Sequence, residues 1–157
     1  MTGSLDMVYR IVPREYFSIK AEGSFEEQAQ HLIEQCHPGA TGMRLRKLSA
    51  DTTEAEIPCQ QSNRALHGFM HGGCFFTVGD TMTALMCLFF VENESERMLT
   101  VNASIRYLRP IGKDTVQAKA RLVRHQGKIL DFVCDFFNEA GKRAAQAKYR
   151  YALVEPR

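Results

Sequence analysis

Hydrophobic and polar residues alternate with a period of two over four segments in the second half of the chain. In the first segment one predicted face is apolar (Leu99, Val101, Ala103, Ile105 and Tyr107), and the other is polar (Thr100, Asn102, Ser104 and Arg106). The other segments cover residues 116–123, 130–136 and 145–151. Turn residues at 126–127 and 138–141 separate these three, as in β-hairpins. The pattern predicts a largely antiparallel sheet with one apolar face.

A long apolar segment precedes this sheet. Between Cys74 and Val91 the only charged residue is Asp80. A segment of about 18 apolar residues approaches the length of a membrane span. Asp80 and several threonines interrupt it, however, and the apolar face of the sheet needs a cover. We therefore predict a buried helix and an α+β fold, in which a curved antiparallel sheet is wrapped around this central helix.

The region before the apolar segment predicts a shorter helix and a hairpin. Ser24 is a suitable N-cap because two acidic residues follow it, and apolar residues then recur at helical spacing until Pro38. Residues 43–57 predict a strand or hairpin with a bend near residues 49–51. Residues 58–70 predict a loop, and the first twenty residues receive no assignment.

Length and charge set mild bounds. A chain of 157 residues is long enough to bury a core of its own. We expect a single domain over residues 1–157, with an N-terminal extension and short helix over 1–40 and the core over 41–154. The formal net charge is +2, and the basic residues are spread along the chain rather than clustered. We therefore expect no nucleic-acid partner.

Cysteine usage and the N-terminus bear on the cellular compartment. The five cysteines form no Cys-x-x-Cys pair, which favours reduced thiols over a disulfide framework. The first twenty residues carry several charges and lack the apolar segment of a secretory signal. We expect a cytoplasmic protein without a membrane partner.

The candidate chemistry lies at the start of the apolar segment and within it. Burial of the Asp80 carboxylate is costly unless a neighbouring group uses or satisfies it. Gly72 and Gly73 allow close approach of a ligand to the backbone at the predicted helix start. Free N–H groups and the helix dipole favour a negative oxygen there. One element therefore carries a candidate oxyanion site and a candidate base.

His67, His71 and Cys74 raise the question of a metal site. Two histidines four residues apart bind zinc when they lie on a helix. The neighbouring glycines predict a loop here instead, and the glutamate of the HExxH motif is missing. We expect no bound metal.

Several motifs together resemble those of hotdog-fold acyl-CoA thioesterases of the phenylacetate-pathway type. The motifs are Asn63, the segment Gly68-x-x-His71-Gly72-Gly73, Asp80 nine residues after His71, the strand from Thr100 to Arg109-Pro110, and the turn Gln126-Gly127-Lys128. They occur in this order over residues 40–153. The resemblance implies the hotdog fold, a central helix wrapped by a curved antiparallel sheet.

The resemblance also implies a catalytic arrangement. Two chains join edge to edge in a homodimer, and the acyl-CoA site lies at the dimer interface. Dimers of this type pair again in different ways, so a homodimer and a homotetramer are both open. Gly72 would donate its backbone N–H to the thioester oxygen. Asp80, supplied by the second chain, would act as general base or nucleophile, and Thr100 would help orient the water. No cofactor is expected, since CoA is part of the substrate.

The residues expected to contact the substrate are His71, Gly73, Arg109, Arg124, Gly127 and Lys128. The basic side chains lie near predicted turns and suit the phosphates of CoA through charge-assisted contacts. The alternative interpretation is that these basic side chains lie in solvent at the protein surface and bind no ligand. His71 is expected to pin its loop by side-chain hydrogen bonds.

One position departs from the family pattern. Ala65 stands six residues before His71, where the family usually carries Asn or Gln, and Asn63 and His67 are near neighbours. The missing amide mildly favours a non-catalytic acyl-CoA-binding protein, whereas Asp80 favours catalysis. A hotdog dehydratase or hydratase is a further alternative, although the motifs of those families are not seen. The acyl chain, the choice between CoA and carrier-protein thioesters, and the choice between dimer and tetramer stay open.

Overall fold

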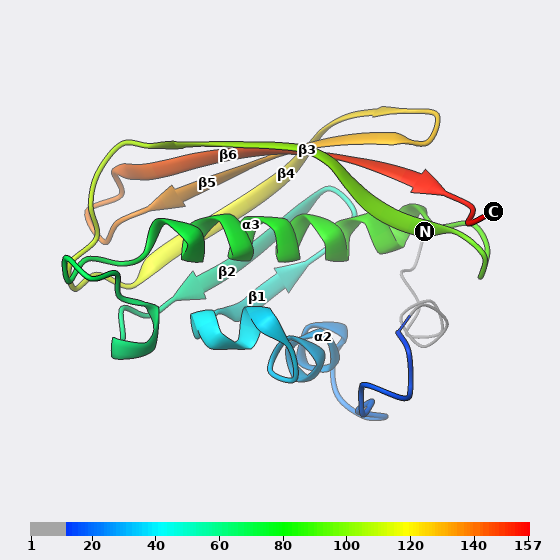
Figure 1. Ribbon diagram of the computed structural model, residues 1–157, viewed down its shortest axis with the longest axis horizontal. Coiled ribbons are helices and arrows are strands. Elements are labelled where there is room, and N and C mark those ends of the chain that lie inside the picture. The colour runs from blue at the N-terminus through cyan, green and yellow to red at the C-terminus, as the bar shows by residue number, and fades with distance from the viewer. Residues whose placement is uncertain (1–11) are drawn as a thin grey trace.

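A single antiparallel sheet curves around one long helix (Figure 1). This computed structural model describes residues 12–157. The strands are β1 Arg44–Leu48, β2 Thr52–Ile57, β3 Arg97–Tyr107, β4 Val116–Gln126, β5 Ile129–Phe137 and β6 Arg143–Val154. They are arranged in the order β1-β2-β4-β5-β6-β3. The helices are α2 Phe25–Ile33 and α3 Gly72–Cys87, and short 3-10 helices cover His37–Thr41, Gln61–Asn63 and Leu88–Phe90.

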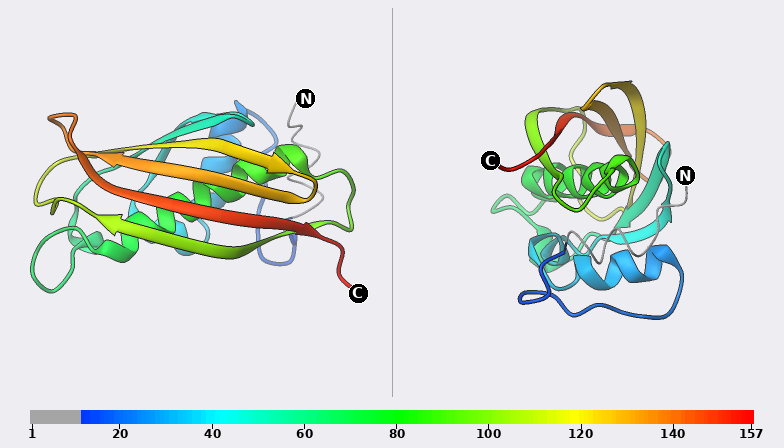
Figure 2. Two further views of the ribbon diagram at one scale, coloured as in Figure 1. Left: turned by 90° about the horizontal axis from the view of Figure 1, so that it is seen from above. Right: turned by 90° about the vertical axis from the view of Figure 1, so that its right-hand side faces the viewer.

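Helix α3 forms the centre of the hydrophobic core. Its residues Val78, Met82 and Met86 are fully buried beneath the inward-facing side chains of the sheet. Figure 2 shows the sheet curving around two sides of α3, and α2 lies along the edge strand β1. The predicted α+β class and the hotdog architecture are therefore confirmed.

The apolar segment is helical over residues 72–90 and, by length and composition alone, is apolar enough to cross a membrane. More than half of its most apolar window is buried inside the protein. The core helix of a globular domain has these same properties, because it must be apolar on most of its surface.

Local signals also agree with the structure at several elements. Ser24 caps α2, and its side chain and that of Glu27 form a reciprocal capping box. The alternation predicted for β4, β5 and β6 matches the residues that face the core. The first eleven residues of the expected N-terminal extension lie outside the described residues.

The alternation predicted for β3 is wrong in its first half. The register shifts between Thr100 and Asn102, and Val101 is the extra residue of a β-bulge. Thr100 pairs with Tyr151, which is buried, so Thr100 faces the helix instead of the outer surface. Leu99 and Val101, predicted for the inner face, are each 52% exposed. One inserted residue exchanges the two faces of a strand, because the side-chain period is two.

Candidate active site

The start of α3 presents a backbone donor that is available for a ligand. His71 is the N-cap, and its ring Nδ1 accepts the N–H of Gly73 at 2.8 Å. The N–H of Cys74 donates to the carbonyl oxygen of His71 at 2.9 Å. For the N–H of Gly72, the first helical residue, the described part of the chain offers no acceptor. A free donor at the positive end of the helix dipole suits a negative oxygen.

A pocket of about 480 Å³ opens beside this helix start. It brings together four of the predicted site residues, namely His71, Gly72, Gly73 and Arg109. The remaining wall is largely hydrophobic and aromatic, with contributions from His67, Phe69, Met70, Phe75, Tyr107, Leu108, Pro110 and Ile111. The guanidinium of Arg109 donates to the carbonyl oxygen of Arg143 at 2.6 Å, which ties it to the start of β6. A mostly apolar pocket with a few polar groups is typical of a small-molecule site.

The Tyr107 side chain packs closely against Gly72. The Tyr107 hydroxyl donates to the Gly72 carbonyl oxygen at 2.8 Å. A Cβ atom at position 72 would lie 3.0 Å from the hydroxyl oxygen and ring of Tyr107. Gly72 therefore accommodates the packing of Tyr107, in addition to its candidate role as a backbone donor to a ligand.

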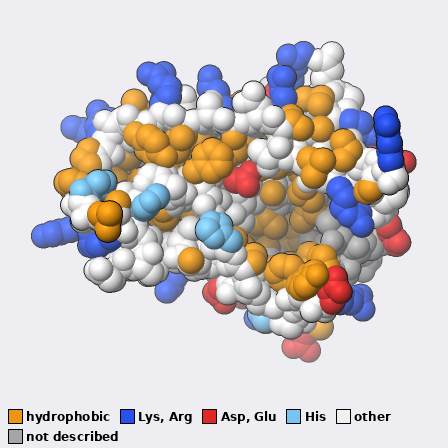
Figure 3. Space-filling model, in the orientation of Figure 1, with side chains coloured by type: hydrophobic (Ala, Val, Ile, Leu, Met, Phe, Trp, Pro, Cys, Tyr) orange, Lys and Arg blue, Asp and Glu red, His pale blue; other side chains and the backbone are white. Residues whose placement is uncertain are grey.

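Asp80 lies two turns further along α3 and is half-buried. Its Oδ1 accepts hydrogen bonds from the Thr100 hydroxyl at 3.0 Å and from the Tyr151 hydroxyl at 2.6 Å. Among the described residues no donor reaches Oδ2. Figure 3 shows that hydrophobic side chains gather along the face of the molecule seen in that view. The carboxylate is thus held by one oxygen while the other is available to a proton donor.

Three tyrosines anchor the sheet to one face of α3, and the sequence did not reveal their role. Their hydroxyls donate to helix carbonyl oxygens spaced four residues apart: Tyr107 to Gly72, Tyr149 to Phe76, and Tyr151 to Asp80. The distances lie between 2.7 and 2.8 Å. The sequence could have indicated this role, because these tyrosines stand at inward positions of apolar strand faces. A buried phenol requires a polar partner.

The predicted residues do not form one site within a single chain. Gly72 and Asp80 are eight residues apart, which corresponds to about 12 Å along a helix. The turn that carries Gly127 and Lys128 lies at the end of the sheet opposite the start of α3 (Figure 1). The structure therefore contains one group around Gly72 and Arg109, a second around Asp80 and Thr100, and a third at the β4–β5 turn.

The basic residues of the β4–β5 turn have partners within the chain. Lys128 pairs with Glu92 at 3.1 Å and also with Glu96, whose side chain is only 3% exposed. The guanidinium of Arg124 donates to the side chain of Gln126. Gly127 has a φ of +59°, which the tight turn requires.

The loop before α3 is organised by Asn63. Its side-chain amide donates to the carbonyl oxygens of Thr41 at 2.9 Å and Pro58 at 2.8 Å, and its Oδ1 accepts the N–H of Gln60. Asn63 is buried, so its amide is committed to holding the loop. It therefore does not replace the amide missing at Ala65.

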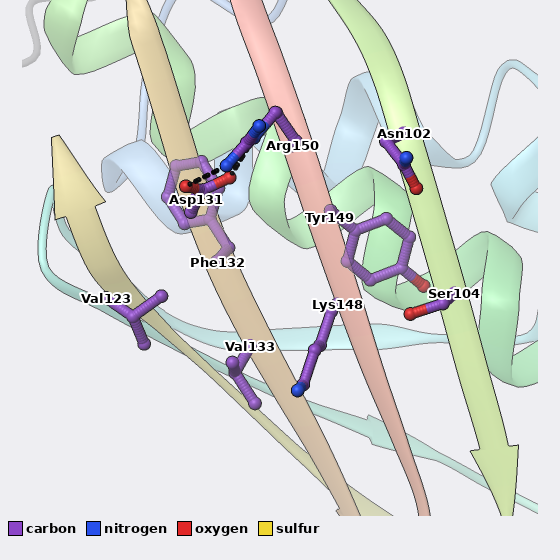
Figure 4. A pocket seen from close by; sticks show the side chains of 9 residues that line it. All are labelled: Asn102, Ser104, Val123, Asp131, Phe132, Val133, Lys148, Tyr149 and Arg150. Atoms are coloured by element: carbon purple, nitrogen blue, oxygen red, sulfur yellow. Dashed lines mark hydrogen bonds and ion pairs between the residues drawn. The ribbon is translucent and has the colours of Figure 1, made fainter. Parts of the chain in front are cut away.

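Two other sites carry no comparable chemistry. A pocket of about 470 Å³ lies on the outer face of the sheet (Figure 4). Two of its three charged residues, Asp131 and Arg150, neutralise each other through two hydrogen bonds, of 2.7 and 3.0 Å, and the third is Lys148. The Cys74 thiol near the start of α3 is a poor nucleophile, because burial raises its pKa to about 12. Within residues 12–157 no group of three His, Cys, Asp or Glu side chains could hold a metal ion.

Comparison with known proteins identifies the family. The model of the Thioesterase superfamily matches residues 67–145, which is half of the chain and includes the start of α3, Asp80 and Thr100. The chain therefore belongs to the thioesterase superfamily. A search of curated proteins gives no match.

Solved structures share the fold at low sequence identity. A mutant thioesterase from Pseudomonas aeruginosa is 17% identical over 88% of this chain and 100% of its own, with a TM-score of 0.78. A thioesterase from Haemophilus influenzae is 18% identical over 88% and 96%, with a TM-score of 0.76. A hypothetical thioesterase from Streptococcus pneumoniae, solved with coenzyme A, is 20% identical over 77% and 93%, with a TM-score of 0.66. These similarities support the hotdog fold.

Proposed function

We propose that this protein hydrolyses acyl-CoA thioesters to the free acid and CoA. One observation carries the proposal: α3 holds a backbone N–H without an acceptor at Gly72 and a carboxylate with one available oxygen at Asp80, as far as the described residues go. The first group suits a developing oxyanion, and the second suits a proton taken from water. Membership of the thioesterase superfamily supports this use of the two groups.

In the proposed reaction the thioester oxygen accepts the Gly72 N–H, and Asp80 takes a proton from the attacking water. A preorganised backbone donor to the oxyanion is worth about 10²–10³ in rate. A positioned general base adds about 10²–10⁴. Collapse of the tetrahedral intermediate breaks the C–S bond, and the proton on Asp80 passes to the CoA thiolate. In the nucleophilic variant Asp80 forms an anhydride that water opens, with the same net products.

The geometry favours a site shared between two chains. A separation of about 12 Å along α3 prevents Gly72 and Asp80 of one chain from serving the same carbonyl carbon. A two-fold dimer would combine Gly72 of one protomer with Asp80 and Thr100 of the other, and would contain two equivalent sites.

The edge strand β3 is the surface that we propose for this dimer. It is an edge of the sheet and eleven residues long, so a second copy of the strand can pair with it. Exposed hydrophobic side chains lie on and beside it: Phe76, Leu99, Val101, Tyr107 and Leu108. Pairing between the β3 strands would cover part of this apolar surface.

Support for a CoA thioester comes from two directions. The Streptococcus pneumoniae relative binds coenzyme A in its solved structure. Arg109 borders the pocket at the start of α3. A contact between its guanidinium and a phosphate of CoA would add the CoA moiety to the ligand that this pocket binds. The aromatic lining from Phe69, Phe75 and Tyr107 favours an aryl or a short-to-medium acyl group, in line with the phenylacetate-pathway type.

The proposal is tested by measuring free thiol release from a panel of aryl-, short- and medium-chain acyl-CoAs. We expect turnover of at least one substrate class, and a fall in kcat of about 10²-fold or more in Asp80→Asn with little change in substrate affinity. Saturable acyl-CoA binding without thiol release would identify a non-catalytic binder. Hydration of an enoyl-CoA without thiol release would identify a hydratase.

A further inference from the structure

The Tyr151 hydroxyl lies at the centre of the hydrogen bonds around Asp80. It is 2.6 Å from Asp80 Oδ1, 2.7 Å from the Asp80 carbonyl oxygen and 2.8 Å from the Thr83 hydroxyl. The Tyr151 side chain belongs to β6 and is 1% exposed. It therefore connects the sheet, the helix backbone and the carboxylate in a buried position.

The direction of these hydrogen bonds follows from counting protons. The carbonyl oxygen and Oδ1 of Asp80 can only accept, whereas the Thr83 hydroxyl can donate to the phenol oxygen. The single proton of Tyr151 is therefore shared between the carbonyl oxygen and Oδ1 of Asp80. Burial, followed by the negative charge of Asp80, raises the pKa of Tyr151 well above its usual range. The phenol stays protonated and remains a donor at any pH at which the protein functions.

We propose that Tyr151 is a positioning residue, which fixes the Asp80 carboxylate through Oδ1 and leaves Oδ2 as the oxygen that accepts a proton from water. The inference rests on the proposed function and deepens it, because it assigns different tasks to the two carboxylate oxygens.

The surroundings of Asp80 are consistent with this role. The titratable groups that interact with it are Tyr149 and Tyr151 from β6 and Cys87 from α3. Burial is the first cause of the raised pKa of Tyr149 and of Cys87, so both groups are neutral near pH 7. From β3 the contact is the uncharged hydroxyl of Thr100. Of the two buried phenols, Tyr151 is the one that donates to the carboxylate.

Tyr149 provides a matched control. It lies two residues away on the same strand, is equally buried, and donates to the backbone oxygen of Phe76 at 2.7 Å. We expect Tyr151→Phe to lower kcat about 10-fold with KM nearly unchanged, and Tyr149→Phe to stay within about 2-fold of the wild type. Equal losses in the two variants would overturn the positioning role.

A spectroscopic measurement that does not need turnover separates this inference from the proposed function. The carboxyl carbon of Asp80 is observed by ¹³C NMR at a fixed pH and assigned with Asp80→Asn. We expect its resonance to shift in Tyr151→Phe, because the hydrogen bond to Oδ1 is lost, and to keep its position in Tyr149→Phe. If Tyr151→Phe does not fold, site-specific 3-fluorotyrosine at position 151, a stronger donor, should shift the same resonance.

An Asp80 carboxyl resonance that is the same in all these proteins would overturn the inference. A wild-type protein that releases no thiol from any acyl-CoA, but whose Asp80 resonance responds to Tyr151→Phe, would contradict the proposed function alone.

Discussion

The Thr100 hydroxyl donates a hydrogen bond of 3.0 Å to the Asp80 carboxylate, although simple alternation along β3 places Thr100 on the opposite face. The β-bulge at Val101 is the cause, because it turns Thr100 inward opposite Tyr151. Bulges next to functional sites commonly redirect one side chain in this way. The irregularity in β3 therefore completes the set of donors around Asp80.

Removal of this hydroxyl should impair turnover more than folding. In Thr100→Val the side chain keeps its shape but loses the hydrogen bond to Asp80, and we expect kcat to fall about 10-fold. Thr100→Ser keeps the hydroxyl and should retain most of the activity. Steady-state kinetics of both variants provide the comparison, and full activity in Thr100→Val would remove Thr100 from the mechanism.

Gly79 should resist the substitution that usually stabilises a helix. Glycine to alanine within a helix normally gains about 0.5–1 kcal/mol. A Cβ at position 79 would instead contact the Tyr149 hydroxyl and lie 2.8 Å from its ring, and Tyr149 is fully packed. We expect Gly79→Ala to lower the free energy of unfolding by about 1–3 kcal/mol. Urea denaturation tests this, with partial recovery expected in Gly79→Ala combined with Tyr149→Phe. A more stable single variant would contradict the packing described.

The ion pair of Lys128 with Glu96 should make stability depend on pH. The hydrogen bond from Lys128 is the main cause of the lowered pKa of Glu96 in the folded protein. A lowered pKa contributes stability above the unfolded value of about 4.3, and this stability is lost as the pH falls through the folded value. Lys128→Ala should therefore melt below the wild type at pH 7, and the difference should shrink toward pH 3. Lys148→Ala, at an exposed position, is the control. A difference in melting temperature between Lys128→Ala and the wild type that does not vary with pH would contradict the stabilising role of this ion pair.

A role of the basic residues in binding CoA has a kinetic consequence. If Arg109 or Arg124 contacts the phosphates, alanine at that position should raise KM for acyl-CoA about 10-fold. KM for the matching acyl-pantetheine, which lacks the nucleotide phosphates, should hardly change. Lys148→Ala on the outer face of the sheet (Figure 4) should affect neither substrate. Equal increases for both substrates would show that the arginines act on the fold or on the acyl group.

Much of the fold could be predicted because burial imposes a period on the sequence. The central helix is apolar nearly all round, and β4, β5 and β6 alternate regularly, since one face of each packs on α3. The bulge at Val101 could not be predicted, because no residue type marks the position at which a strand gains one residue. Its effect on Leu99 and Thr100 was missed for the same reason.

The candidate site was predictable only where the chemistry is local. Gly72 and Asp80 stand out in the sequence because glycines precede an apolar segment that holds a single charge. Tyr151 does not, since its contact with Asp80 joins residues 71 positions apart. We predicted a common role for Arg109 and Lys128 because both lie near predicted turns, but these turns lie at opposite ends of the sheet (Figure 1).

The central claim is that each complete site takes Gly72 from one chain and Asp80 from another, and mixed dimers test it most directly. Gly72→Pro removes the N–H, and proline is well tolerated at the first helical position. His71 has φ −63° and ψ 131°, which suits a residue before proline. Gly72→Ala makes a similar contact with Tyr107 but keeps the N–H, so it is the matched control.

The measurement is thiol release by dimers of one Gly72→Pro chain and one Asp80→Asn chain, purified with two different affinity tags. We predict that these mixed dimers recover up to about half of the wild-type activity, because one of their two sites receives both intact groups. Each parent homodimer should be inactive, while the Gly72→Ala homodimer should retain turnover. Confirmed mixed dimers as inactive as their parents would contradict a site shared between chains.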